Sequence, residues 1–222
     1  MEILYKSKNC IVINKPAGMP VEPDLSRDPD AMTLSSLHLK ENGENGELWL
    51  VHRLDRVVGG LVVFARNKKS AAELSRLFSE HKLLKEYYAV VEGELLGEGE
   101  MRDYIYKDAQ ASKAYIVDRK RNGVKEAVLN YKHLETQITE RGARSLLSIS
   151  LLTGRYHQIR AQLASRRHSL VGDGKYGSTD KGARMPALFA FHLSFSLFSE
   201  RVDIKIMPDK GAYPFSLWRN FL

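Results

Sequence analysis

The sequence predicts an α+β fold with a mixed, mostly antiparallel sheet flanked by helices and loops. About eight segments are rich in β-branched or aromatic residues, and about two to four have helical periodicity. The two kinds do not alternate regularly, which argues against a parallel α/β fold. We expect a single domain over residues 1–222, because this length suits one large domain.

Strands are expected where β-branched and aromatic residues cluster between turn residues. The expected strands cover residues 11–13, 61–65, 87–93, 113–117, 128–133, 146–152, 188–198 and 202–206. A loop over 14–20 follows the first strand, because two prolines and a glycine interrupt regular structure there. The strand over 61–65 is uninterruptedly apolar, which predicts burial on both faces. Residues 118–123 are expected to form a charged turn between strands, and the basic residues over 119–125 belong either to a charged hairpin turn or to a phosphate-contacting surface.

Three segments are expected to form helices. They cover residues 33–40, 70–84 and 159–166. In the second, Ala71, Leu74 and Leu77 recur every three residues and define a buried face. Asn67 or Ser70 is placed to cap its N-terminus.

Composition narrows the class of partner. The chain has 34 Lys and Arg against 27 Asp and Glu, a formal net charge of +7, which favours a polyanionic partner. Cys10 is the one cysteine, and the histidines lack metal-site spacing, so we expect a reducing compartment and no metal. No apolar stretch has membrane-spanning length. We therefore expect a cytoplasmic monomer that does not bind membranes.

The segment over residues 52–60 is a candidate catalytic loop. Asp55 precedes Gly59 and Gly60, so its carboxylate lies on a loop whose backbone can approach a ligand. A turn cap is an equally weighted interpretation of this aspartate. Arg53 is consistent with a solvated charge, and Tyr87, at the start of a later strand, with a core tyrosine.

A second candidate segment precedes the third expected helix. Arg155, His157, Gln158 and Arg160 lie within six positions there. Arginines at a helix N-terminus can bind phosphate or neutralise a buried carboxylate. On spacing alone, an exposed basic face is the favoured interpretation.

Five sequence strings together resemble the motifs of the RluA branch of the RNA pseudouridine synthases. In chain order they are INKPAGMPV (13–21), HRLDRVVGGLVVFAR (52–66), KEYYAVVEG (85–93), TGRYHQIRAQLA (153–164) and VGDGKYG (171–177). The resemblance extends over roughly residues 3 to 198, and the combination of motifs in this order is distinctive.

The resemblance implies specific roles for site residues. Asp55 corresponds to the catalytic aspartate, Tyr87 to a tyrosine against the target base, and Arg160 to an arginine paired with the catalytic carboxylate. Arg53 corresponds to an arginine that enters the RNA helix where the target nucleotide has left it. The remaining expected substrate contacts are Arg155, His157, Gln158 and Leu193.

The resemblance also implies the pseudouridine synthase catalytic fold and its activity. The expected reaction converts uridine to pseudouridine in structured rRNA or tRNA by base flipping, with no cofactor and no metal. We expect no appended N-terminal RNA-binding domain, because the resemblance begins at about residue 3. The alternative is a non-catalytic RNA-binding or RNA-folding protein on the same fold; a DNA-binding protein lacks any supporting motif.

The sequence departs from the family pattern in two places. Val58 and Gly59 stand where the family usually has Thr-Ser, and Arg167-His168-Ser169 stands where it usually has Gly-His-Pro. Neither departure affects the expected catalytic residues. They bear on how the loop after Asp55 is braced and on which RNA is bound.

Overall fold

The computed structural model describes residues 2–220, which form two compact units. The first unit contains residues up to 85 together with 190–208, and the second contains 86–189 together with the segment from 209 onward. Each unit is therefore completed by a segment from late in the chain. Whether the two form one domain, as expected from the length, stays a prediction.

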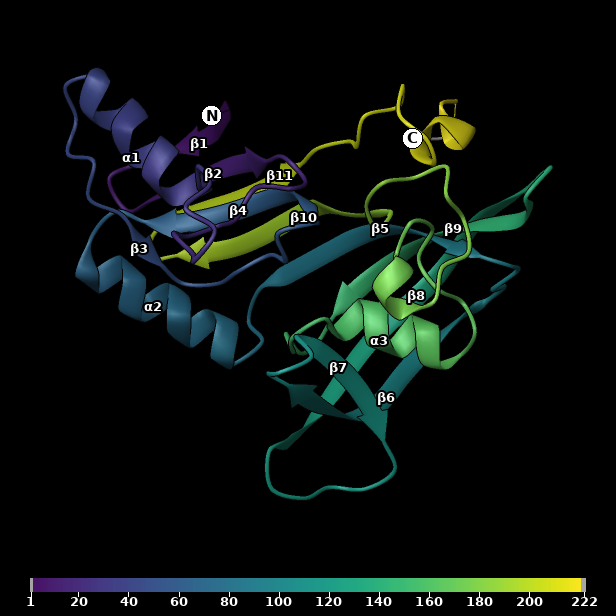
Figure 1. The fold of residues 1–222 in the computed structure, drawn as a ribbon. Helices are drawn as coiled ribbons and strands as arrows, with labels where there is room; N and C mark the ends of the chain where they lie inside the picture. The colour runs from purple at the N-terminus through teal and green to yellow at the C-terminus, as the bar shows by residue number, and fades with distance from the viewer. Residues whose placement is uncertain (1, 221–222) are drawn as a thin grey trace. The chain divides into compact units, whose positions relative to one another are not determined.

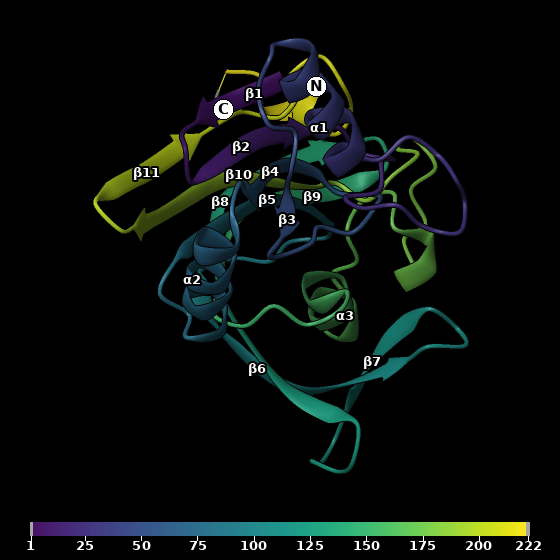
Figure 2. The ribbon, with the colours of Figure 1, turned by 90° about the vertical axis from the view of Figure 1, so that its left-hand side faces the viewer.

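The first unit is an antiparallel sheet with two helices (Figure 1). Its strands are β1 (Glu2–Lys6), β2 (Cys10–Lys15), β3 (Trp49–Leu50), β4 (Gly59–Ala65), β10 (Leu188–Leu197, from Ala190 onward) and β11 (Glu200–Lys205). The sheet order is β1, β2, β4, β10 and β11, with β3 paired to β4. The helices α1 (Ala31–Glu41) and α2 (Lys68–Ser79) lie on opposite sides of this sheet (Figure 2).

Burial in the first unit follows the sequence pattern. Every residue of β4 is buried, as its uninterrupted apolar run predicts. The amphipathic helix α2 packs Leu74 and Leu77 against Val12, Leu61 and Val63 of β2 and β4. These two strands form the base of the loop that contains Asp55.

The second unit is an antiparallel sheet covered on one face by a helix. Its strands are β5 (Leu84–Glu92, from Glu86 onward), β6 (Glu98–Asp108), β7 (Lys113–Val117), β8 (Val124–Thr139) and β9 (Gly142–Leu151), in the order β5, β9, β8, β6, β7. The helix α3 (Gln158–Ser165) packs Ala161 against Ile105, Ala114 and Ala127 (Figure 1). Two short 3₁₀ helices, η1 (Gly174–Tyr176) and η2 (Phe215–Trp218), complete the unit, and η2 buries Trp218 beside Val90 and Leu146.

The α+β class is confirmed, while several element boundaries differ from expectation. Three strands, β1, β3 and β6, were not expected. The longest of them is β6, which contains several charged residues and buries Met101 and Ile105. Segment 118–123 connects β7 to β8, which lie on opposite sides of β6, so this charged turn does not close a hairpin. No helix within residues 2–220 is long and apolar enough to cross a membrane.

The start and end of α2 have clear local causes. Asn67 caps the N-terminus, because its side chain accepts a hydrogen bond from the backbone N–H of Ser70 at 2.8 Å. The helix ends at Ser79 rather than near residue 84. His81 takes a left-handed conformation with φ 56°, and the N–H of Lys82 returns to the carbonyl of Leu77 at 2.9 Å.

Candidate active site

Asp55 lies in the loop between β3 and β4, in the first unit. The backbone N–H of Val58 donates to the carbonyl of Asp55 at 2.9 Å, so the chain turns directly after the aspartate. Gly60 then enters β4 with φ 115°, and a Cβ atom there would lie 2.2 Å from the carbonyl oxygen of Ala190. This close approach of β10 explains why the loop ends in glycine.

A buried lysine lies beneath this loop. The Nζ of Lys15, at the end of β2, donates to the carbonyl oxygens of Pro16 at 3.0 Å, Met19 at 2.8 Å and Arg56 at 3.2 Å. The Lys15 side chain is fully buried, and this burial lowers its pKa to about 8, while the Asp55 carboxylate acts in the opposite direction. Because that attraction is mutual, the ammonium favours the ionised form of Asp55.

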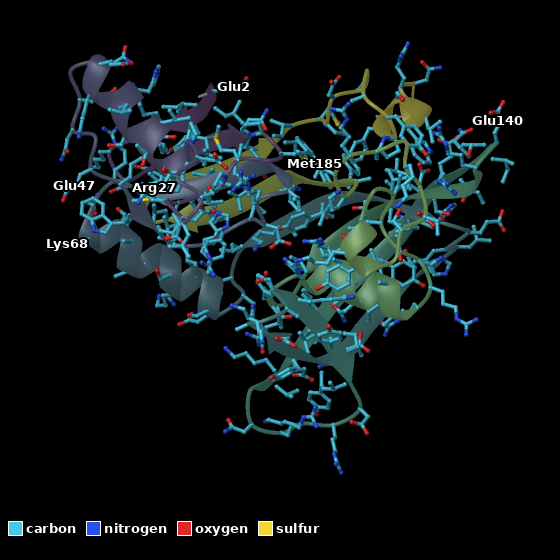
Figure 3. The ribbon with its side chains drawn as sticks, in the orientation of Figure 1. Glu2, Arg27, Glu47, Lys68, Glu140 and Met185 are labelled. Atoms are coloured by element: carbon cyan, nitrogen blue, oxygen red, sulfur yellow. The ribbon has the colours of Figure 1, made fainter. Side chains whose placement is uncertain are left out.

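Arg56 fixes the catalytic loop to the segment that precedes α1. Its Nε donates to the carbonyl of Gly18 at 2.9 Å, its Nη1 donates to Ser26 Oγ at 3.0 Å, and its Nη2 pairs with the carboxylate of Asp28. Two of these partners, Ser26 and Asp28, flank Arg27, which is labelled in Figure 3. The hydrogen bonds of Arg56 and Lys15 therefore hold the loop that contains Asp55 in place.

Arg53 is held much more loosely than Arg56. Its Nη1 donates to Glu22 Oε1 at 3.0 Å, and the two side chains are 63% and 37% exposed. This accessibility is compatible with the expected contact to RNA, which stays a prediction.

His52 begins the HRLD string and is half-buried, with its Nδ1 atom enclosed. Its Nε2 accepts a hydrogen bond from the N–H of Val63 at 3.0 Å, and its ring stacks on Phe78 at a centroid distance of 4.5 Å. Burial holds the pKa of His52 well below its usual range, with Lys85 adding to the effect. The neutral ring therefore fixes the start of the catalytic loop to β4.

Arg160 lies on α3 in the second unit, where it pairs with Asp173. Its Nε donates to Asp173 Oδ2 at 2.7 Å and its Nη2 to Asp173 Oδ1 at 2.8 Å, a bidentate arrangement between two buried side chains. The guanidinium also lies over the ring of Tyr176, 5.0 Å from its centroid. An ion pair between Arg160 and Asp55 stays a prediction.

His157 caps α3 in a left-handed conformation, with φ 51°, and bonds to Tyr176. Its Nδ1 lies 2.9 Å from the hydroxyl of Tyr176, which also accepts the N–H of Ala114 at 2.8 Å. Burial, followed by the nearby charges of Arg160 and Lys175, lowers the pKa of His157 to about 3. The His157 ring is therefore neutral, and its Nδ1 and the Tyr176 hydroxyl share one hydrogen bond.

Gln158 and Arg155 hold the turn that leads into α3. Gln158 Oε1 accepts from Thr153 Oγ1 at 2.8 Å and from the N–H of Arg155 at 2.9 Å, and its Nε2 donates to the carbonyl of Val128 at 3.1 Å. Arg155 Nε donates to the carbonyl of Glu126 at 2.7 Å. These contacts give both residues a structural function, and their contact with substrate stays a prediction.

Two expected site residues are buried in their own units. Tyr87, on β5, is 5% exposed and faces Ile149 of β9 across the sheet. Leu193, on β10, is 2% exposed and packs in the same core as Val63 and Leu74. Their roles beside the substrate stay predictions.

Within each unit, the structure places further residues in contact with the candidate site residues, and the motif assignment gave these contacting residues no role. Lys15 belongs to the INKPAGMPV string, and Asp173 and Tyr176 belong to VGDGKYG. The strings therefore include these residues, but they do not show which residues each of them contacts. In residues 2–220, no group of three or more His, Cys, Asp and Glu side chains is placed to hold a metal ion.

The fold and motifs define the class of protein, and comparison with known proteins gives the family. The α+β fold contains the HRLD, K-x-Y and HQIR segments on which the resemblance to RNA pseudouridine synthases rests. The family model described as RNA pseudouridylate synthase matches residues 9–165. This chain belongs to the RNA pseudouridylate synthase family, which confirms the resemblance seen in the motifs.

Bacterial relatives extend the similarity over most of the chain. An uncharacterised RNA pseudouridine synthase of Haemophilus influenzae is 30% identical over 220 residues, covering 96% of this chain and 90% of the relative. The tRNA pseudouridine synthase C of Haemophilus ducreyi is 34% identical, with coverages of 83% and 77%. The ribosomal large subunit pseudouridine synthase D of Zymomonas mobilis is 31% identical, with coverages of 88% and 64%.

Two solved human structures share the fold. RNA Pseudouridylate Synthase Domain Containing 1 has a TM-score of 0.76 at 23% identity, covering 96% of this chain and 85% of that one. RNA Pseudouridylate Synthase Domain Containing 4 has a TM-score of 0.76 at 24% identity, with coverages of 98% and 92%. These matches support the predicted pseudouridine synthase fold.

Proposed function

We propose that this chain converts uridine to pseudouridine in structured ribosomal or transfer RNA, with Asp55 as the catalytic residue. Family membership supports the reaction, and relatives named for tRNA and for the large ribosomal subunit support these substrate classes. The observation that carries the proposal is the braced loop of Asp55, which has the Lys15 ammonium beneath it. A non-catalytic RNA-binding protein has no need for this arrangement.

The reaction is a rearrangement within one nucleoside. The C1′–N1 bond breaks, a C1′–C5 bond forms, C5 loses its proton and N1 gains one, so substrate and product have the same atoms. A carboxylate can attack ribose C1′, attack base C6 or remove a proton, and Asp55 is suited to each route when ionised. No cofactor or metal is needed for this balance.

Arg160 is proposed to support the Asp55 carboxylate. A planar guanidinium can bind two acceptors with fixed geometry, and Asp173 and Tyr176 hold that of Arg160 in one orientation. Arg160→Ala is therefore expected to reduce turnover much more than RNA affinity. The matched control is Arg166→Ala, because Arg166 pairs with the carboxylate of Asp103 at 2.9 Å and is more exposed.

The outcome distinguishes two functions of Arg160. Loss of RNA affinity with normal turnover at saturating RNA would assign Arg160 to phosphate binding instead. Loss of turnover in the Arg166→Ala control to the same extent would show that the effect comes from altering the helix.

The substrate must be flipped out of the RNA helix before it can react, which costs a few kcal/mol. Tyr87 is proposed to stack on the uracil, a contact worth about 1–3 kcal/mol, while Arg53 occupies the vacated space. The second unit offers lysines beside aromatic rings, with Lys107 over Tyr156 at 4.6 Å and Lys113 over Tyr176 at 5.1 Å. These side chains are suited to phosphate contacts next to unpaired bases.

Pseudouridine maps of total RNA from cells with and without the gene would test the proposed function. Carbodiimide adducts on pseudouridine identify modified positions in ribosomal and transfer RNA. At least one position is expected to lose its adduct without the gene and to regain it when purified protein is added. Identical maps, with RNA binding retained, would favour the non-catalytic alternative.

We also propose that the protein acts as a monomer in the cytoplasm. Cys10 is fully buried in the first unit, and burial raises its thiol pKa to about 11, which keeps it protonated and inert. A single sedimenting species of about 25 kDa would support the monomer.

A further inference from the structure

Two arginines of the catalytic loop contact acidic residues in the segment between β2 and α1. Arg53 pairs with Glu22, while Arg56 pairs with Asp28 and lies 3.8 Å from Asp24. All five residues belong to the first unit, so these contacts lie within one compact body. The two arginines nevertheless differ strongly in how firmly they are held.

Arg56 is fixed at several points, and Arg53 at one. Arg56 bonds to a backbone carbonyl, a hydroxyl and a carboxylate, as described above. For Arg53, the contact within residues 2–220 is the single hydrogen bond to Glu22, in a pair that is largely open to solvent. An exposed ion pair of this kind changes an equilibrium by only about 1.5- to 5-fold. Arg53 can therefore exchange its partner easily, while Arg56 cannot.

The backbone that precedes Glu22 is fixed to α1. The carbonyls of Pro20 and Val21, just before it, accept the N–H groups of Ala31 and Met32 at 3.0 Å each. Both carbonyls are thus fixed to the first turn of α1, and Val21 is buried. The backbone next to Glu22 is therefore held in place, so opening of the pair requires side-chain motion only.

We propose that Glu22 determines RNA specificity by retaining Arg53 until an RNA supplies the space left by a flipped-out uridine. The inference rests on the proposed function, in which Arg53 fills that space. A lone phosphate offers the guanidinium one partner and must approach the negative charge of Glu22. A vacated position in a helix offers stacking and several acceptors, which compensates for the lost ion pair. Glu22 thus makes the binding of non-target RNA less favourable, while the binding of target RNA is affected less.

The test measures binding of an RNA that has no target. The probe is an RNA hairpin made only of guanosine and cytidine, which contains no uridine. Glu22→Gln is expected to lower the dissociation constant for this hairpin by about 2- to 5-fold, the range of an exposed ion pair. The matched control is Glu73→Gln, which removes a carboxylate from its partner Arg76 on α2 and changes the net charge equally.

A double-mutant cycle connects the effect to Arg53. In the Arg53→Ala background, Glu22→Gln is expected to change affinity no more than Glu73→Gln does. The inference would be overturned by an equal effect of the two glutamate substitutions, by persistence of the Glu22 effect without Arg53, or by weaker binding of Glu22→Gln. Unchanged unfolding midpoints would show that all variants are folded, as the exposure of the pair predicts.

This experiment is separable from the proposed function. The hairpin contains no uridine, so binding to it requires no catalysis. If the wild-type protein forms no pseudouridine but the cycle shows coupling, the proposed function fails while the Glu22 contact with Arg53 still governs RNA binding. If pseudouridine forms and the cycle shows no coupling, the inference alone fails.

Discussion

Replacement of Lys15 by methionine is expected to change how stability depends on pH. In the folded chain Lys15 is fully buried, and its pKa is lowered from 10.5 to about 8. Between pH 8 and 10.5 the unfolded chain therefore binds more protons at this residue than the folded chain. Linkage then requires the contribution of Lys15 to the free energy of unfolding to increase with pH through this window.

The size of the effect follows from the pKa difference. The difference between 10.5 and about 8 corresponds to about 3 kcal/mol between the two protonation states. Below pH 8 Lys15 stays charged although burial makes the charged form less favourable. The hydrogen bonds from its ammonium group to the three carbonyls offset part of this unfavourable free energy. Lys15→Met removes the charge and the bonds together, and the carbonyls of Pro16 and Met19 lose this donor.

Denaturant unfolding of the wild type and Lys15→Met at pH 7 and pH 10 provides the measurement. The stability of the wild type relative to the variant is expected to increase by about 2–3 kcal/mol from the lower to the higher pH. Comparison with the variant cancels the other titrating groups, including the thiol of Cys10. Lys8→Met is the control, because Lys8 is an exposed lysine on the same unit. An equal stability difference at both pH values would refute the assignment of a buried, pKa-shifted Lys15.

Three further predictions concern the second unit. Arg167 has φ 64° shortly after α3, a conformation that favours glycine, so Arg167→Gly should raise the free energy of unfolding by about 1 kcal/mol in urea unfolding; no gain would show that the turn is unstrained. Asp173→Asn leaves Arg160 buried without its ionic partner, so it should lower stability by about 3 kcal/mol and reduce turnover in the same preparation, and normal turnover would contradict the bracing role. Tyr176→Phe removes the hydroxyl that bonds His157 and should cost about 1–3 kcal/mol in thermal unfolding; a neutral effect would show that water replaces it.

Local sequence determined much of the fold. The cap of α2 and the buried strand β4 depend on residues within a few positions; the burial of β4 is confirmed, and Asn67 is the cap of the two candidates expected. Strand β6 was not predicted, because its charged residues resemble a loop and its pairing with β8 joins segments far apart in the chain. The early end of α2 depends on the left-handed conformation of His81. This conformation is uncommon for residues other than glycine, so a histidine at this position did not predict the end of the helix.

The candidate site shows the same limit. The motif strings, taken together, predicted roles for Asp55 and Arg160, and these roles stay predictions. They did not reveal that Lys15 binds the carbonyl after Asp55, 41 positions along the chain, or that Asp173 holds Arg160. Such partners follow from three-dimensional packing and not from spacing.

Tritium release from RNA labelled at C5 of uridine tests the central claim most directly. Formation of the C1′–C5 bond expels the C5 hydrogen, so each pseudouridine releases one tritium to water. Wild-type protein is expected to release tritium from ribosomal or transfer RNA, whereas Asp55→Asn should release none while it binds the same RNA with nearly unchanged affinity. Sustained tritium release by Asp55→Asn would contradict the assignment of Asp55 as the catalytic residue.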